Sequence, residues 1–88
     1  MKIKISLLDK RNKPLFDSSL DLDFPEESTV KSIVNYFKDN KARIVAQVIQ
    51  DSPQQYGNVM ERMGLVAAML LNFDWDGEMV EKKIYLRA

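Results

Sequence analysis

Cysteine and histidine are both absent from the 88 residues of the chain. Without cysteine there is no disulfide, no thiolate zinc site and no thiol nucleophile. Without histidine the chain lacks the commonest metal ligand and the usual general base near neutral pH. Carboxylates, lysines and tyrosines are the remaining groups for acid–base chemistry. The sequence therefore favours a protein that is not an enzyme and that needs no metal ion and no cofactor.

An excess of charge of either sign is also missing, because 13 Lys and Arg residues balance 13 Asp and Glu residues. A nucleic-acid-binding protein usually carries a basic excess, since much of its affinity comes from neutralising phosphates. No apolar run approaches the roughly 20 residues of a membrane span, and the N-terminus alternates like a strand rather than like a signal peptide. We therefore expect a cytoplasmic protein that does not bind membranes and for which nucleic acid is an unfavoured partner.

Glycine and proline are scarce, with three residues of each, while 45% of the residues are hydrophobic and 30% are charged. This composition is typical of a folded globular chain, and the length suits a single domain over residues 1–88. The three glycines stand alone at positions 57, 64 and 77, so no glycine-rich phosphate-binding loop is present.

The first third of the chain predicts a β-hairpin. Residues 2–8 and 15–24 both alternate between apolar and polar side chains, and the polar stretch DKRNKP lies between them. A turn centred between Asn12 and Lys13 would place Ile3 opposite Leu22. On the other face it would place Lys2 opposite Asp23 and Lys4 opposite Asp21, so that opposite charges pair across the strands. The hairpin tip leaves Lys10, Arg11 and Lys13 unpaired.

Two helices are predicted before residue 52. Val30, Ile33, Val34 and Phe37 form an apolar stripe at helical spacing, and Ser28 or Thr29 would be the N-cap. Residues 42–51 are rich in Val and Ile and also suit a strand. The spacing of their apolar positions favours a helix, and the two helices could be one helix that bends at DNK.

A third helix is predicted from Ser52 to about Leu71. Ser52 as N-cap, Pro53 at the first helical position and Gln55 two residues later form a helix-start signal. On this helix Gly64 and Ala68 would share one face, where small side chains allow another helix to come close. That face would be a homodimer seam or would pack on the chain's own earlier helix. Met60 and Met63 beside it favour a partner-binding surface, since methionine adapts to irregular contacts.

The segment NFDWDGEMV places Asp74, Asp76 and Glu78 at alternate positions. A calcium loop of the EF-hand kind needs about twelve residues with a Glu at the last position, and this spacing does not provide it. Asp76-Gly77 is a strong two-residue turn signal that would set Phe73 opposite Val80 and Trp75 opposite Glu78. We therefore interpret the carboxylates as part of a turn, followed by a strand over residues 79–87.

The predicted fold is α+β. It consists of an N-terminal hairpin, two or three helices packed on one face, and a C-terminal strand that completes a three-stranded sheet beside the first strand.

The predicted function is a small non-catalytic protein-binding module: a regulator, inhibitor or adaptor that contacts another protein or a second copy of itself. The residues expected to bind the partner are Lys10, Arg11, Lys13, Met60, Met63, Gly64 and Ala68. The alternatives are a nucleic-acid-binding protein that uses the basic hairpin tip with Arg43, and an enzyme or enzyme subunit that depends on carboxylates such as Asp74 and Asp76.

Overall fold

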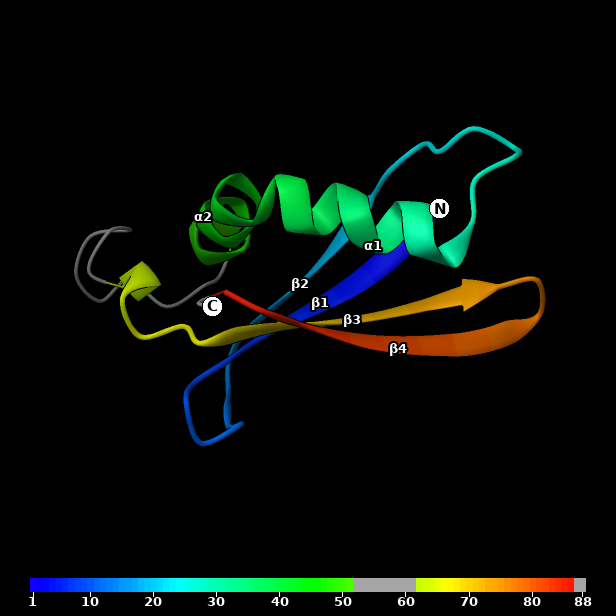
Figure 1. The fold of residues 1–88 in the computed structure, drawn as a ribbon. Helices are drawn as coiled ribbons and strands as arrows, with labels where there is room; N and C mark the ends of the chain where they lie inside the picture. The colour runs from blue at the N-terminus through cyan, green and yellow to red at the C-terminus, as the bar shows by residue number, and fades with distance from the viewer. Residues whose placement is uncertain (52–61, 87–88) are drawn as a thin grey trace.

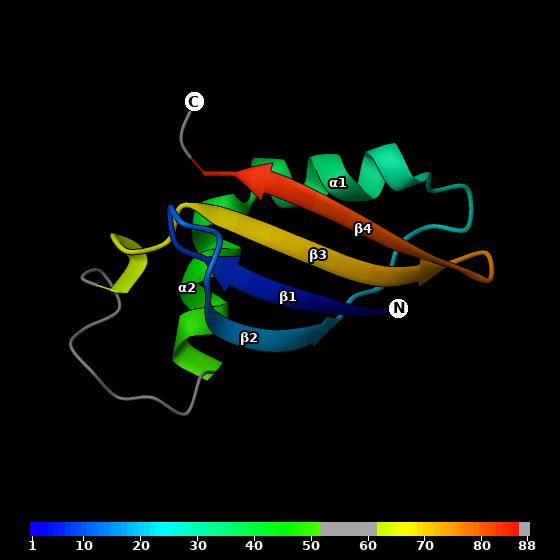
Figure 2. The ribbon, with the colours of Figure 1, turned by 90° about the horizontal axis from the view of Figure 1, so that it is seen from below.

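The structure is a computed structural model that describes residues 1–51 and 62–86. Its elements, in chain order, are β1 (Lys2–Leu8), β2 (Pro14–Asp21), α1 (Val30–Asp39), α2 (Lys41–Asp51), β3 (Ala68–Trp75) and β4 (Glu78–Tyr85). The strands form one antiparallel sheet in the order β2-β1-β3-β4, and both helices lie on the same face of it (Figures 1 and 2). The predicted α+β class is confirmed, but the sheet has four strands instead of three.

The hairpin of β1 and β2 forms as the alternation predicted, but its register differs. Ile3 pairs with Leu20 and Lys2 with Asp21, so residues 2–7 meet partners two positions earlier than expected, and Leu8 pairs with Pro14 after a register shift between Leu7 and Leu8. Asp9 and Lys13 close the turn through a backbone hydrogen bond of 2.9 Å that centres it on Arg11, and the irregularity between Leu7 and Leu8 then moves the pairing by one residue, which leaves a net shift of two. A shift of two keeps every side chain on its predicted face. Ile3 and Ile5 are consequently buried, while Lys2 and Lys4 are exposed.

The predicted third helix is wrong in its second half, because Ala68–Trp75 is strand β3. Met69, Leu71 and Phe73 face the helices and are buried, while Ala68 on the opposite face is buried as well. A central strand covered in part on both faces has a nearly continuous apolar sequence, which helical spacing imitates. The predicted helix start at Ser52, Pro53 and Gln55 lies outside the described residues.

The position of the last strand also differs from the prediction. Strand β4 pairs with β3 at the sheet edge, and β3 occupies the place beside β1 that was expected for the last strand. The turn between them is confirmed, since Phe73 pairs with Val80 and Trp75 with Glu78. The turn residues Asp76 and Gly77 have positive φ values of 55° and 85°, as a type I′ turn requires.

The helices begin and end for local reasons. Thr29 is the N-cap of α1, and it forms a capping box in which its hydroxyl accepts from the Ser32 N–H and Ser32 Oγ accepts from the Thr29 N–H. Asn40 separates α1 from α2, and residues 42–51 are helical, which settles the choice between helix and strand. No helix among residues 1–51 and 62–86 is long and apolar enough to cross a bilayer.

One hydrophobic core lies between the helices and the sheet. It joins buried residues of both helices to the inward faces of all four strands. Phe37 at the end of α1 and Phe73 on β3 are its largest fully buried side chains. On the other face of the sheet no helix of residues 1–51 and 62–86 is packed, and Met79 and Tyr85 are exposed there.

Candidate binding groove at the hairpin tip

The hairpin tip is held rigid by the side chain of Asp9. Its Oδ1 accepts hydrogen bonds from the backbone N–H of Arg11 at 2.8 Å and of Lys13 at 2.9 Å. The Asp9 carbonyl also accepts from the Asn12 N–H at 3.0 Å, and Asn12 takes a left-handed conformation with φ of 65°. An aspartate that bonds the backbone after it is a typical way to fix a short loop. The loop is therefore ordered by its own sequence.

The same hydrogen bonds determine the charge of Asp9. The backbone N–H groups of Lys13 and Arg11 stabilise the ionised carboxylate and hold the pKa of Asp9 below its ordinary value, with help from the two positive side chains. Asp9 is therefore negative at neutral pH, and its donors lie within the loop. The loop itself thus has one negative charge against three positive ones, and the Lys83 ammonium of β4 also donates to the Asn12 side chain of this loop.

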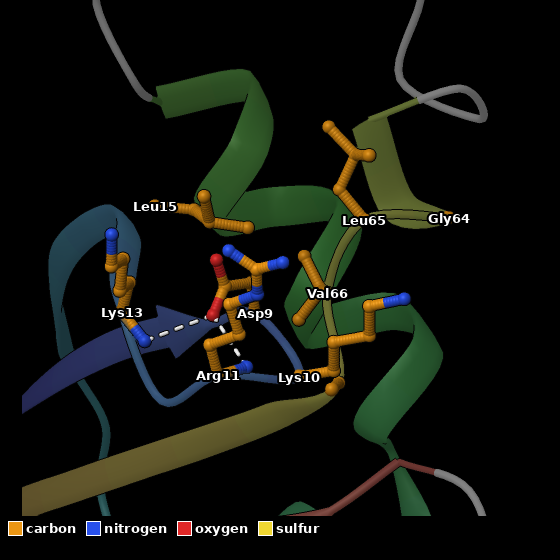
Figure 3. A pocket seen from close by; sticks show the side chains of 9 residues that line it. Asp9, Lys10, Arg11, Lys13, Leu15, Gly64, Leu65 and Val66 are labelled. Carbon is orange, nitrogen blue, oxygen red and sulfur yellow. Dashed lines mark hydrogen bonds between the residues drawn. The ribbon is translucent and has the colours of Figure 1, made fainter.

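Three positive side chains, those of Lys10, Arg11 and Lys13, extend from this loop into solvent. They lie at an open groove of about 550 Å³ between the hairpin tip and the chain that leads into β3 (Figure 3). The groove is lined by Asp9, Lys10, Arg11, Lys13, Leu15, Gly64, Leu65, Val66 and Ala67. We call this site the tip groove.

The second wall of the tip groove is fixed by backbone hydrogen bonds. The N–H groups of Leu65 and Val66 donate to the carbonyls of Arg62 and Met63, both at 3.1 Å, and so form a turn. The Ala67 N–H then donates to the Leu8 carbonyl at 2.8 Å, which joins this wall to the end of β1. Val66 is buried in the core, whereas 61% of the Leu65 surface is exposed. The wall thus presents one large apolar side chain beside three cations.

Four of the seven predicted partner-binding residues meet at the tip groove: Lys10, Arg11, Lys13 and Gly64. The proposed helical face of Gly64 and Ala68 is wrong, because Gly64 lies in a turn and Ala68 begins β3 with 1% of its surface exposed. Met63 lines a separate cavity of about 190 Å³ between α2 and the end of the sheet. Met60 lies outside the described residues.

Sequence reasoning missed Leu65 and Arg62. An exposed leucine has no sequence signature of its own, and it becomes notable only beside the cations of the hairpin tip. Arg62 is 8% exposed, and its guanidinium carbon lies 4.7 Å from the centroid of the Phe16 ring. Its Nη2 makes no hydrogen bond within the described residues. Arg62 therefore packs on Phe16 as a cation–π partner and does not line the tip groove.

The other candidate residues lie elsewhere. Arg43, which was considered for nucleic-acid binding, is on α2 and donates to the Tyr36 hydroxyl at 3.0 Å. Asp74 accepts from the Gly77 N–H at 3.1 Å and so supports the turn between β3 and β4. Within residues 1–51 and 62–86, no three Asp or Glu side chains come together in a group that could hold a metal ion.

Comparison of the chain with protein-family models, with curated proteins and with solved structures finds no match in any of the three.

Proposed function

We propose that the chain is a non-catalytic protein-binding module whose tip groove receives an acidic segment of another protein. The observation that supports this proposal is the convergence of Lys10, Arg11 and Lys13 with the exposed Leu65 on one groove. These residues come from two parts of the chain that are more than 50 positions apart in the sequence. The module would act as a regulator, inhibitor or adaptor, through contact rather than through a reaction.

The chemistry of the groove defines the kind of ligand. Three cations line the groove, and the one carboxylate among them, that of Asp9, already accepts hydrogen bonds within the loop. This arrangement favours a segment with several Asp or Glu residues. Each exposed ion pair contributes only about 0.2–1 kcal/mol, so three of them give weak binding. Burying the Leu65 side chain against an apolar residue of the partner would add up to about 2 kcal/mol. The best ligand therefore carries acidic residues on both sides of an apolar one.

A nucleic acid is the second candidate, because the same three exposed cations could contact phosphates. If only three phosphates were contacted, the logarithm of the association constant would fall with the logarithm of the salt concentration with a slope of about 3. This slope is small for a specific binder. The apolar side chain of Leu65 gives such a ligand no favourable contact unless a base stacks on it. The acidic protein segment uses both features of the groove and is the better fit.

The proposal can be tested by an NMR titration of the ¹⁵N-labelled chain with a blocked peptide of sequence Glu-Asp-Leu-Glu-Asp. A 16-base-pair DNA duplex serves as the comparison ligand. We expect the peptide to shift the amide signals of residues 10–13 and 64–67 in a saturable way. Shifts confined to other residues, or tighter binding of the duplex than of the peptide, would contradict the proposal.

A further inference from the structure

Strand β4 has one side of its backbone free of pairing within the described residues, because it lies at the sheet edge (Figure 2). Next to a two-residue turn, Trp75 and Glu78 form a hydrogen-bonded pair, so Glu78, Val80, Lys82 and Ile84 direct their backbone groups toward β3. The Leu86 N–H continues this phase by donating to the Ala67 carbonyl at 3.1 Å. The backbone groups of the alternate residues, Met79, Glu81, Lys83 and Tyr85, therefore point away from the sheet.

A second groove runs beside this free edge. It has a volume of about 410 Å³ and lies between α1 and β4, which run alongside each other in Figures 1 and 2. It is lined by Val30, Lys31, Val34, Asn35 and Lys38 from α1 and by Lys82 from β4. We call it the edge groove.

The edge groove has an apolar floor and a positive rim. Val30 and Val34 are half-buried, whereas Lys31, Lys38 and Lys82 are exposed. No carboxylate lines the groove, and within the described residues none lies within 4.0 Å of these three lysines. Lys82 is on the helix-facing side of β4, so its charge points to where the side chains of an added strand would lie.

We propose that β4 accepts an extended segment of a partner protein as a fifth strand, and that this segment places acidic residues at alternate positions facing the edge groove. Its backbone would pair with Met79, Glu81 and Lys83. Its groove-facing residues would lie beside Val80 and Lys82, with carboxylates near the three lysines and an apolar residue on the valines. This surface is separate from the tip groove and does not depend on the function proposed there.

The opposite edge of the sheet does not suit the same segment. Strand β2 begins with Pro14, which has no N–H to donate, and it carries Asp17 and Asp21. Both aspartates lie on the open face of β2, and its helix-facing residues are uncharged, namely Phe16, Ser18 and Leu20. An acidic strand would therefore meet either no cation of β2 or two like charges. The two edges of the sheet thus differ in the charge of the strand that they would accept.

A second copy of this chain fits the edge less well than an acidic partner does. Antiparallel pairing of two β4 strands about Lys82 would match Glu81 with Lys83 on the open face. It would also place two Lys82 side chains opposite each other, with the lysines of both α1 helices close by. A charge directed inward from an edge strand is a known barrier to such association. The acidic segment neutralises this barrier, whereas a second copy doubles it.

The probe is a blocked seven-residue peptide, Thr-Glu-Thr-Val-Thr-Glu-Thr, in which Glu and Val occupy the alternate, groove-facing positions. Two N-methylated versions form a matched pair. Methylation of the third and fifth residues removes N–H groups that would face β4, whereas methylation of the second and sixth removes N–H groups that would face solvent. Strand addition predicts that only the first version loses binding, by about tenfold or more for two lost hydrogen bonds.

Protein variants test the charges. The double change Lys38→Glu and Lys82→Glu should weaken binding of the unmodified peptide about tenfold, because two attractive contacts become repulsive. Reversal of Lys10, Arg11 and Lys13 at the tip groove should leave the affinity of this peptide within twofold. Circular dichroism and the chemical shifts of distant amides establish that each variant is folded.

Three results would overturn the proposal. The first is equal affinity of the two N-methylated peptides, and the second is no binding of the unmodified peptide at 1 mM. The third is a dimer in light scattering that the neutral change Lys82→Ala strengthens, since removal of the inward charge would then show that the edge serves a second copy. None of these results bears on the tip groove, so the two proposals fail separately.

Discussion

The turn between β3 and β4 permits a quantitative test of the structure, through replacement of Gly77 by alanine. Gly77 has φ of 85°, and a Cβ atom added to it would meet nothing within 4 Å. The cost is therefore one of backbone conformation alone. A left-handed conformation costs an L-residue about 1–2 kcal/mol. Alanine also has less backbone freedom than glycine in the unfolded state, and this difference stabilises the fold by about 0.4–1 kcal/mol. It therefore offsets part of the conformational cost.

The net expectation is that Gly77→Ala lowers the free energy of unfolding by about 1 kcal/mol. For a domain of this size that corresponds to a fall in Tm of about 4–8 °C. Gly77→Asn should cost less than Gly77→Ala, because asparagine tolerates the left-handed region better than alanine does. Urea unfolding can be followed by the fluorescence of Trp75, the single tryptophan, which lies next to the turn.

The two substitutions together separate backbone conformation from other causes. If Gly77→Ala is more stable than the natural chain, the turn does not have the positive φ that the structure gives it. If asparagine costs as much as alanine, conformational preference is not the reason for the loss. A loss well above about 2 kcal/mol would mean that the added methyl group meets atoms that the structure does not place there.

Three further predictions follow from the core, the helix cap and the hairpin tip. Phe37→Ala should lower the free energy of unfolding by about 3–5 kcal/mol in urea, because the ring is fully buried; a loss below 1 kcal/mol would contradict its place in the core. Thr29→Ala should cost about 1 kcal/mol in the same assay, and Thr29→Ser should restore most of it; equal losses would exclude the capping box. The lowered pKa of Asp9 stabilises the fold above the ordinary aspartate pKa, and this stabilisation is lost as the pH falls through the lowered value. Asp9→Asn should therefore flatten the acid side of the stability–pH curve, and NMR titration of the Asp9 carboxyl should give a midpoint below 3.8; a midpoint above it would refute the hydrogen bonds of the loop.

The sequence predicts the local elements of this fold better than their arrangement. Alternation identifies β1 and β2, and helical spacing with a Thr29 cap identifies α1, because both patterns are recorded in neighbouring residues. The hairpin register depends on how Asp9 closes the turn. Adding one residue to such a loop would give every β1 residue a different partner on β2. The alternation of apolar and polar residues does not identify β3 as a strand, because its place in the middle of the sheet buries both of its faces in part.

The tip groove shows the same division between local and distant information. The cations Lys10, Arg11 and Lys13 are visible in the sequence as an unpaired hairpin tip. Gly64 was singled out for a reason that proved wrong, namely its place on a helix face, and it nevertheless lines the same groove. Only the pairing of β1 with β3 brings the two segments together, and that pairing follows from the topology of the sheet rather than from spacing along the chain.

The most direct test of the protein-binding proposal is the affinity of the Glu-Asp-Leu-Glu-Asp peptide for a variant with Lys10, Arg11 and Lys13 all changed to Glu. Loss of three ion pairs of about 0.2–1 kcal/mol each, with repulsion added, predicts that the dissociation constant rises at least about tenfold. The control variant, Lys2→Glu with Lys4→Glu, changes the charge of two exposed residues on β1 that line neither groove, and it should bind within twofold of the natural chain. If the tip variant binds as well as the natural chain does, the cations of the hairpin tip do not hold the ligand and the proposed binding function is wrong.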